Sequence, residues 1–416
     1  MRISIPWQAW YGDEDLTLTF PDDWKAKAYW PHDAPDLDEE AIEAAFDDPI
    51  GTAPIEKLVR EKVAEGKRTV AIAVDDISRA TPARRLLPEL MRRLEMGGVD
   101  LDDVRVVLGV GMHRLMTKEE MVKKLGEAVV DRLDVYNSYP HGNLTDYGVS
   151  ERGTPIKVSS HFAEADIKIG VGSIAPHGGP GFGGGAKVVI PGVASFETVA
   201  AMHKPGRLKT GLLNVDHNEL RADIEDMVGK VGLDAIINVV LTSRRGIAGA
   251  FVGHFIEAHR AAVALAKKVY ATEMPEAPVD IAICSAYPKD TDFLQSGLAL
   301  NVLSTAALVE GSPFVVKEDG TVVVVTASPE GRGHHALYSP GMVYGRREGD
   351  WRLAGPDYQG RPIAYFSPHI TPQDARNLDT FRAWEEVVAY LGKRHDCPKV
   401  AVFPCGALQI AANALA

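Results

Sequence analysis

The chain is poor in cysteine, in long apolar runs and in positive charge. Its 416 residues include three cysteines, Cys284, Cys397 and Cys405, and none of them forms a CxxC pair. An odd number of widely spaced cysteines argues against a disulfide framework and favours a reducing compartment. No apolar run reaches the roughly 18 residues that a membrane-spanning helix needs. The first residues do not join a basic start to an apolar run, so we expect no secretory signal. These absences predict a cytoplasmic protein with no membrane partner.

The charge balance excludes a further class of partner. The formal net charge is −12, whereas a general nucleic-acid binder needs a cationic surface. A local cationic pocket for a small anion is still compatible with this balance. The sequence shows no internal repeat of the length that solenoid and propeller proteins use. A chain of this length exceeds one compact core, which predicts two or three domains.

Strand-like and helix-like segments alternate along most of the chain. We expect strands at 68–76, 104–111, 165–174, 281–287, 321–328 and 399–406, and helices at 81–98, 117–133, 195–204, 255–271 and 298–310. Thr117 with Glu120 has the spacing of a capping box. The stretch TEMPEAPVD (272–280) has the composition of a linker. This alternation predicts two α/β domains with largely parallel sheets, divided as 1–271 and 272–416.

Polar clusters follow four of the expected strands. They are DDISRATP (75–82), MHRLMT (112–117), PHGGPGFGGGAK (176–187) and PKDTDFLQ (288–295). In open α/β sheets, ligands bind beyond the carboxyl ends of the strands. The four clusters are therefore expected to face one crevice.

The glycines of the third cluster match neither standard nucleotide motif. Gly179, Gly181 and Gly184 form a GxGxxG after a strand, but KVVIPG interrupts the helix that should follow and the acidic ribose contact is missing. Ala186 precedes Lys187 and Val188 follows it, which excludes a phosphate-binding P-loop. The glycines are interpreted as admitting a ligand close to the backbone.

Each polar residue taken alone has a structural alternative. Asp75, Asp76 and Arg79 are compatible with a turn that carries a surface ion pair, and His113 with a hydrogen-bonded histidine at a strand end. His203 shares a helix face with Phe196, and an inward histidine is more often a core residue than a ligand. The convergence of the clusters favours a site.

Four segments in this order resemble the nickel-dependent lactate racemase family. They are DDISRATP (75–82), GMHRLMT (111–117), HGGPGFGGGAKVVIPGVASFETVAAMH (177–203) and YPKDTDFLQ (287–295), and the resemblance covers most of the chain. It implies an N-terminal cofactor-binding domain, a C-terminal α/β domain and an active-site cleft between the domains. It also implies a nickel-pincer nucleotide, a pyridinium-3-thioamide-5-thiocarboxylic acid mononucleotide, as cofactor, and cofactor-synthesis enzymes as maturation partners.

The resemblance also implies a role for individual residues. Lys187 would carry the cofactor as a thioamide, His203 would bind nickel, and Gly183, Gly184 and Gly185 would close around the cofactor beside Asp76. His113 and His177 would be the acid/base pair. Arg79 would bind the substrate carboxylate, and Gln295 would contact substrate from the second domain. The implied reaction inverts C2 of a 2-hydroxy acid by reversible hydride transfer to the cofactor.

The chain departs from the family pattern on the expected substrate side. Leu298 stands where a lysine is usual three residues after the glutamine, and Gly183 replaces a common serine. The second cation for a carboxylate is therefore missing, which makes lactate a doubtful substrate and favours a 2-hydroxy acid with a longer aliphatic or aromatic tail. A sugar-acid 2-epimerase is the alternative within the family. A non-catalytic nickel-cofactor carrier is a rival, although it would not need the histidine pair. An NAD-dependent dehydrogenase is a second rival, but this sequence lacks the acidic residue that such an enzyme uses to bind the ribose of NAD. His334 and His335 are interpreted as an exposed loop pair.

Overall fold

A computed structural model describes residues 1–204, 211–338, 357–375 and 378–415. The chain divides into two compact units, a middle unit of Ala34–Ala266 and a terminal unit of Met1–Asp33 with Lys267–Ala416. This division differs from the predicted domains chiefly in the segment Met1–Asp33. The physical reason is that β3 (Lys25–Ala28) pairs in parallel with β20 (Lys399–Phe403) of the terminal unit. The N-terminal segment thus completes a sheet built mainly by the end of the chain.

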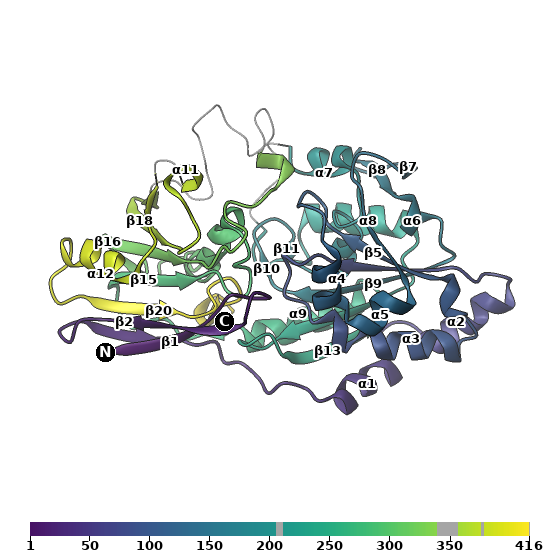
Figure 1. Ribbon diagram of the computed structural model, residues 1–416, viewed down its shortest axis with the longest axis horizontal. Helices are drawn as coiled ribbons and strands as arrows, with labels where there is room; N and C mark the ends of the chain where they lie inside the picture. Colours follow the sequence, from purple (N-terminus) through teal and green to yellow (C-terminus); the bar gives the residue numbers. More distant parts are fainter. Residues whose placement is uncertain (205–210, 339–356, 376–377, 416) are drawn as a thin grey trace. The chain divides into compact units, whose positions relative to one another are not determined.

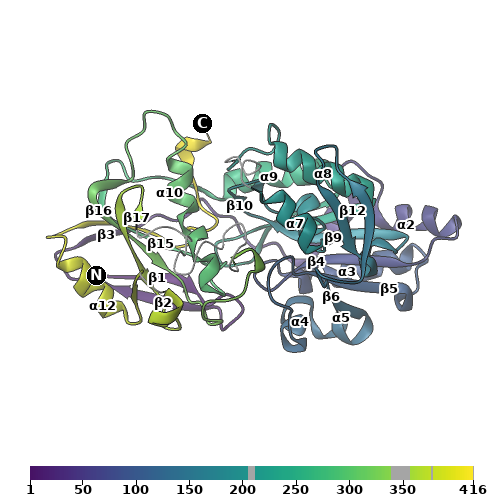
Figure 2. The ribbon, with the colours of Figure 1, turned by 90° about the horizontal axis from the view of Figure 1, so that it is seen from above.

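The middle unit is built on a six-stranded sheet of order β13-β12-β9-β4-β5-β6 (Figures 1 and 2). All neighbouring pairs are parallel except β12 with β13. Strands β4, β9 and β12 are buried along nearly their whole length, as expected where both faces of a parallel sheet are covered. The bounds are β4 Val70–Asp75, β5 Val104–Gly109, β6 Asp134–Asn137, β9 Ile167–Ile174, β12 Ala235–Leu241 and β13 Ile247–Gly253.

The order of these strands brings three of the four polar clusters together. The chain runs from β4 to β5 and β6 on one side, then returns to place β9 and β12 on the other side of β4. The sheet therefore has a topological switch point between β4 and β9, where open α/β sheets bind their ligands. Residues 75–82, 112–117 and 176–187 follow β4, β5 and β9. These three clusters therefore follow neighbouring strands, as predicted, whereas the convergence of the fourth cluster on the same crevice stays a prediction.

The terminal unit contains a second, largely parallel sheet of order β17-β18-β16-β15-β20-β3, with β19 paired to β18. The pair β17–β18 is antiparallel. The fourth polar cluster, residues 288–295, follows β15. An N-terminal hairpin, β1 with β2, packs its apolar residues into the same core. The bounds are β1 Arg2–Trp7, β2 Glu14–Thr19, β15 Val279–Ser285, β16 Val316–Val325, β17 Asp357–Tyr358, β18 Arg361–Phe366 and β19 Asp379–Phe381. Both sheets confirm the predicted α/β class.

Side-chain caps precede some of the helices, and Thr117 is one of them. Thr117 accepts from Glu120 N, and Glu120 Oε2 accepts from Thr117 N at 2.9 Å, so the predicted capping box is confirmed. The helix predicted over 117–133 is nevertheless two helices, because Gly126 interrupts it with a φ of 92°. The main helices are α1 Glu39–Asp47, α2 Ile55–Ala64, α3 Leu87–Met96, α4 Lys118–Leu125, α5 Glu127–Arg132, α7 Phe196–Met202, α8 Glu219–Val231, α9 Glu257–Val269, α10 Asn301–Ala306 and α12 Trp384–Gly392.

Short elements complete the two units. They are α6 Ser160–Ala163, α11 Pro372–Ala375, the strand pairs β7 Leu144–Val149 with β8 Pro155–Ser159, β10 Pro176–His177 with β11 Gly181–Phe182 and β14 Ala271–Thr272 with β21 Ile410–Ala411, and single 3-10 turns such as Gly185–Val188 and Phe293–Leu300. Within the described ranges, no helix is both long and apolar enough to cross a bilayer.

Candidate active site

Asp76 and His113 form a close hydrogen-bonded pair beyond the ends of β4 and β5. His113 Nδ1 lies 2.6 Å from Asp76 Oδ2. An ionised carboxylate can only accept hydrogen bonds, so Nδ1 is the protonated ring nitrogen and Nε2 carries the lone pair. Burial would raise the pKa of Asp76, but the charge and hydrogen bond of His113, together with Arg79 and Ser78, hold that pKa well below its usual range. The pair is thus an imidazole oriented by a carboxylate that stays ionised.

Ser78 connects this pair to Arg79. The backbone N–H and Oγ of Ser78 both donate to Asp76 Oδ1, at 3.2 and 2.5 Å. Arg79 Nη1 donates to Ser78 Oγ at 2.8 Å, and the Arg79 side chain is half-buried. Asp76 is 2% exposed. The alternative interpretation of Asp76 as part of a surface turn is therefore wrong.

A buried lysine supports the same loop from beneath. Lys124 Nζ lies 2.6 Å from Asp75 Oδ1 and donates to the carbonyls of Asp76 and Arg79 at 3.0 and 2.8 Å. Its side chain is fully buried. Burial lowers the pKa of Lys124, and Asp75 opposes that shift. Thr81 fixes the other Asp75 oxygen through a 2.5 Å hydrogen bond.

Lys187 lies in the turn that ends the glycine loop, which we define as residues 176–187. Its backbone N–H donates to Gly184 O at 3.3 Å, within the 3-10 turn Gly185–Val188. Gly184 and Gly185 have positive φ values of 71° and 60°. A Cβ on Gly184 would meet Ile174 and Asn238, and one on Gly185 would meet the ring of His259. At these two positions the space that glycine leaves is filled by the protein itself.

His203 is the C-cap of α7 and is half-buried, and of the inward face predicted for that helix Val199 is buried. The buried residues of α7 are Thr198, Val199, Ala201 and Met202, whereas Phe196 is half-buried. His203 Nδ1 lies 2.7 Å from Val199 O, and a carbonyl only accepts, so Nδ1 carries the proton. Burial lowers the pKa of His203, and Lys187 is close enough to lower it further. His203 is thus a neutral imidazole beside Lys187 with its lone pair on Nε2.

His177 has the opposite protonation pattern. Gly179 N–H donates to His177 Nδ1 at 3.2 Å, which places the proton of the neutral ring on Nε2. The side chain is half-buried within the glycine loop. Beyond the loop, Gly111 N–H donates to Gly192 O at 2.8 Å, which joins the segment carrying His113 to the segment that follows Lys187.

The remaining predicted residues lie in the terminal unit. Gln295 is buried, and its Nε2 donates to Asp292 Oδ2 at 2.6 Å. Leu298 is half-buried in the turn Phe293–Leu300. His334 is exposed, as predicted, whereas His335 is half-buried against Tyr338. The active-site cleft expected between the domains stays a prediction, as do the substrate contacts of Gln295 and Leu298.

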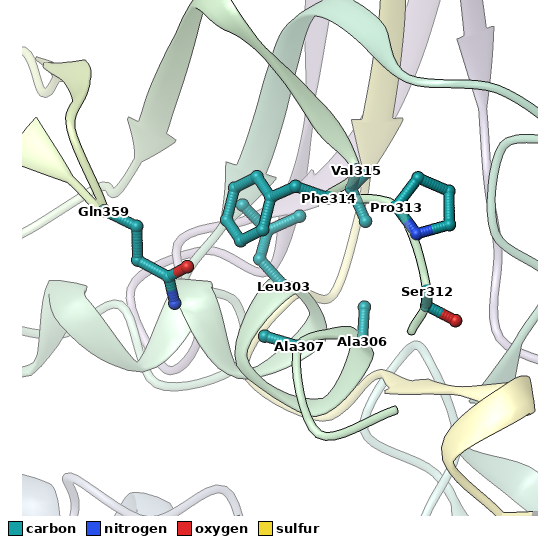
Figure 3. Close-up of a pocket in the computed structure, with 8 residues that line it drawn as sticks. All are labelled: Leu303, Ala306, Ala307, Ser312, Pro313, Phe314, Val315 and Gln359. Carbon is teal, nitrogen blue, oxygen red and sulfur yellow. The ribbon is translucent and has the colours of Figure 1, made fainter. Parts of the chain in front are cut away.

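A small pocket in the terminal unit contains none of the predicted site residues. Its volume is about 140 Å³, and it lies beside α10 and the start of β16 (Figure 3). The apolar side chains of Leu303, Phe314 and Val315 line it together with Ser312 and Gln359. Its lining residues lie outside the four polar clusters.

Sequence reasoning missed the residues that support the site. These are Ser78, Lys124, Arg221, Asn238 and His259. For Lys124 a signal was present, because Met121, Lys124 and Leu125 share one helix face and a lysine on such a face needs a buried partner. Arg221, Asn238 and His259 lie in other elements far along the chain, and no local pattern links them to the glycine loop.

Comparison with known proteins identifies the family. Residues 11–210 match the model of the lactate racemase N-terminal domain. A lactate racemase from Lactiplantibacillus plantarum is 31% identical over 310 residues, which are 72% of this chain and 69% of the relative. One from Thermoanaerobacterium thermosaccharolyticum is 28% identical over 351 residues, 81% of this chain and 77% of the relative.

Solved structures show the same fold. The structure of the lactate racemase apoprotein from Thermoanaerobacterium thermosaccharolyticum gives a TM-score of 0.74 at 23% identity, covering 99% of this chain and 100% of that one. The crystal structure of a Thermotoga maritima protein gives 0.61 at 18% identity, covering 90% and 98%. Together with the sequence matches, these findings show that the chain belongs to the lactate racemase family.

Proposed function

We propose that the protein is an isomerase that inverts C2 of a 2-hydroxy acid by reversible hydride transfer to a nickel-pincer nucleotide tethered to Lys187. Relatives named lactate racemase support a racemase activity. The observation that carries the proposal is the pair of half-buried His113 with buried Asp76, which supplies an oriented base. It lies in the same unit as Lys187 and His203.

The residues around Lys187 fit such a cofactor. His203 has a neutral ring and its Nε2 lone pair, the form in which imidazole binds nickel. Within the described ranges, no group of three His, Cys, Asp or Glu side chains could hold a metal ion. A metal at His203 would take its other ligands from the cofactor that Lys187 would tether, and Lys187 lies near enough to His203 to lower the pKa of that histidine. A Cβ on the half-buried Gly183 would lie 3.5 Å from Ser173 O, which is an ordinary van der Waals contact, so this position is less tightly packed than Gly184 and Gly185.

The polar residues divide the remaining chemistry between them. When bound, the nickel-pincer nucleotide supplies the acceptor and donor of the C2 hydride. Arg79, whose Nη1 is oriented by Ser78, binds the substrate carboxylate. His113 takes the hydroxyl proton of one enantiomer at Nε2, and Asp76 stabilises the resulting imidazolium.

His177 is the base that takes the hydroxyl proton of the other enantiomer. In the resting arrangement its Nε2–H donates a hydrogen bond to the substrate oxygen. To act as a base at Nε2, the ring has to carry its proton on Nδ1, and this breaks the 3.2 Å bond from Gly179. Neutral imidazoles suit both tasks because their ordinary pKa is close to neutral pH.

The substrate is a 2-hydroxy acid with a longer aliphatic or aromatic tail if Leu298 lines the site, as it would by its position in the family pattern. We also propose that cofactor-synthesis enzymes are needed for maturation. The test is a panel of aliphatic, aromatic and sugar 2-hydroxy acids, assayed by chiral chromatography on protein that carries the Lys187 adduct. Inversion of an apolar member supports the proposal. Inversion of a sugar acid alone favours the 2-epimerase alternative, and loaded protein that inverts no acid in the panel favours a carrier.

A further inference from the structure

The glycine loop lies against the first turn of α8. Asn218 caps that helix and its Nδ2 donates to Gly179 O at 2.8 Å. Arg221 follows in the first turn with a fully buried side chain. Its guanidinium donates to three loop carbonyls, to Pro180 O from Nε at 3.3 Å, to Gly184 O from Nη1 at 3.3 Å, and to Phe182 O from Nη2. One side chain therefore holds alternate residues of the loop.

Two further buried side chains hold the loop. Asn238 Oδ1 accepts from Gly185 N–H at 2.7 Å. His259 Nε2 lies 2.9 Å from Gly183 O, and Arg260 Nη1 lies 3.1 Å from His259 Nδ1. Because an arginine can only donate, Nδ1 accepts and Nε2–H donates to Gly183. Burial, with Arg221 nearby, lowers the pKa of His259 well below its usual value, so the ring stays a neutral donor.

The glycine identities follow from these contacts. A Cβ on Gly184 would lie 2.5 Å from Ile174 Cδ1 and 2.8 Å from Asn238 Oδ1. A Cβ on Gly185 would lie 2.8 Å from His259 Cδ2. Positive φ at both positions adds strain for any other residue. The loop is glycine-rich at these positions because it is packed onto its own support.

The positive charge of Arg221 makes its hydrogen bonds to the glycine loop important for stability. Burial lowers its pKa to about 10, so the side chain is still cationic at neutral pH. Its carboxylate partner, Glu225, is 4.0 Å from Nε and is shared with Arg260, which it contacts at 2.8 Å. A buried cation is costly unless its hydrogen bonds are satisfied. The loop carbonyls accept those hydrogen bonds. If the loop moved away, the buried guanidinium of Arg221 would lose its acceptors.

We propose that Arg221, with His259 and Asn238, is a positioning element that fixes the backbone of the glycine loop and so presents Lys187 for cofactor attachment. The link to Lys187 is direct, because Gly184 O accepts from both Arg221 and the backbone N–H of Lys187. The attachment step rests on the proposed function, whereas the fixing of the loop does not.

The test compares Arg221→Met with Arg221→Lys and with a matched control, Arg93→Met. Arg93 is also buried and paired, with Glu89 and Asp47, but it contacts no part of the glycine loop that the structure describes. Amide hydrogen exchange is measured on unloaded protein. Loop amides of Arg221→Met are expected to exchange at least about ten-fold faster than wild type, because three charged hydrogen bonds are lost. Arg93→Met should leave these amides unchanged, and Arg221→Lys should recover part of the protection.

Peptide mass spectrometry of protein made alongside the cofactor-synthesis enzymes gives the second readout. The fraction of Lys187 carrying the adduct should fall in Arg221→Met and not in Arg93→Met. Unchanged loop exchange in folded Arg221→Met would overturn the proposal. If Arg221→Met does not fold, His259→Phe and His259→Gln report on the Gly183 contact, and equal loop protection in these two variants would overturn it. A wild type that acquires no adduct refutes the proposed function, while hydrogen exchange still decides the role of Arg221.

Discussion

Replacing Asp76 by asparagine should reverse the tautomer of His113. The two carboxylate oxygens have different partners, since Oδ1 accepts from Ser78 N–H and Oγ, and Oδ2 faces His113 Nδ1 at 2.6 Å. In Asp76→Asn, the two Ser78 donors hold the amide oxygen on their side. The amide N–H₂ then faces His113 and donates to Nδ1, so the proton of the ring moves to Nε2. His113 loses its lone pair at the nitrogen that we assign as the base.

The size of the effect follows from the kind of contact. A hydrogen bond to a charged group contributes about 1.5–3 kcal/mol, which corresponds to about a ten- to 150-fold change in rate. The wrong tautomer adds to this loss, and general acid–base catalysis as a whole is worth about 10²–10⁴-fold. We therefore expect kcat of Asp76→Asn to fall by at least about ten-fold and by up to about 10⁴-fold.

The assay is turnover of the loaded enzyme in each direction, with the nitrogen chemical shifts of His113 measured by NMR to report its tautomer. Ser78→Ala is the control for the tautomer, because it keeps the carboxylate against His113. It also removes the hydroxyl that orients Arg79, so its activity should fall while the His113 nitrogen shifts stay those of the wild type. Melting curves of both variants establish that they are folded. An Asp76→Asn enzyme that is fully loaded and turns over at the wild-type rate would refute the assignment of His113 as an oriented base.

Three further changes test other parts of the structure. Lys124→Met should lower the free energy of unfolding by about 3–5 kcal/mol, because Asp75 is left without its buried partner. In the same urea titrations, the control Lys123→Met, at an exposed position, should change the free energy of unfolding by less than about 0.5 kcal/mol. Equal effects of the two substitutions would contradict a stabilising Lys124–Asp75 pair. Because burial lowers the pKa of His259 in the folded chain, the unfolded chain takes up the proton first as the pH falls below about 6.5, and stability is lost below that pH and not above it. His259→Gln should therefore reduce the pH dependence of the unfolding free energy below about pH 6.5 by up to about 1.4 kcal/mol per pH unit, and an unchanged slope would show that His259 is not a buried neutral group. His203→Ala should retain the Lys187 adduct but lose stoichiometric nickel by metal analysis, and full nickel content would remove His203 as the ligand.

The sheets of the middle unit could be predicted because their strands are short apolar runs with polar residues at their ends. β4, β5 and β9 are such runs, and the clusters after them converge because the strands are neighbours. The segment Met1–Asp33 could not be placed in this way. β3 pairs with β20 near the opposite end of the chain, and no local pattern encodes that contact. The helix over 117–133 was predicted too long because the sequence around Gly126 does not show that this glycine adopts a positive φ.

The polar residues of the site could be identified from sequence, but their protonation could not. Asp76 and His113 stood out as residues that follow strands, whereas the proton position depends on hydrogen bonds that only the fold creates. The glycines were interpreted as space for a ligand. At Gly184 and Gly185 the missing Cβ instead faces Asn238 and His259, a distinction that depends on elements far away in the sequence.

Attachment of a nickel-containing cofactor to Lys187 underlies the proposed function and can be measured directly. Protein produced alongside the cofactor-synthesis enzymes is examined by intact and peptide mass spectrometry, with nickel quantified on the same sample and a relative from Lactiplantibacillus plantarum loaded in parallel. We expect a mass adduct that maps to Lys187 together with nearly one nickel per chain. An unmodified Lys187 without nickel, in cells that load the relative, would contradict it.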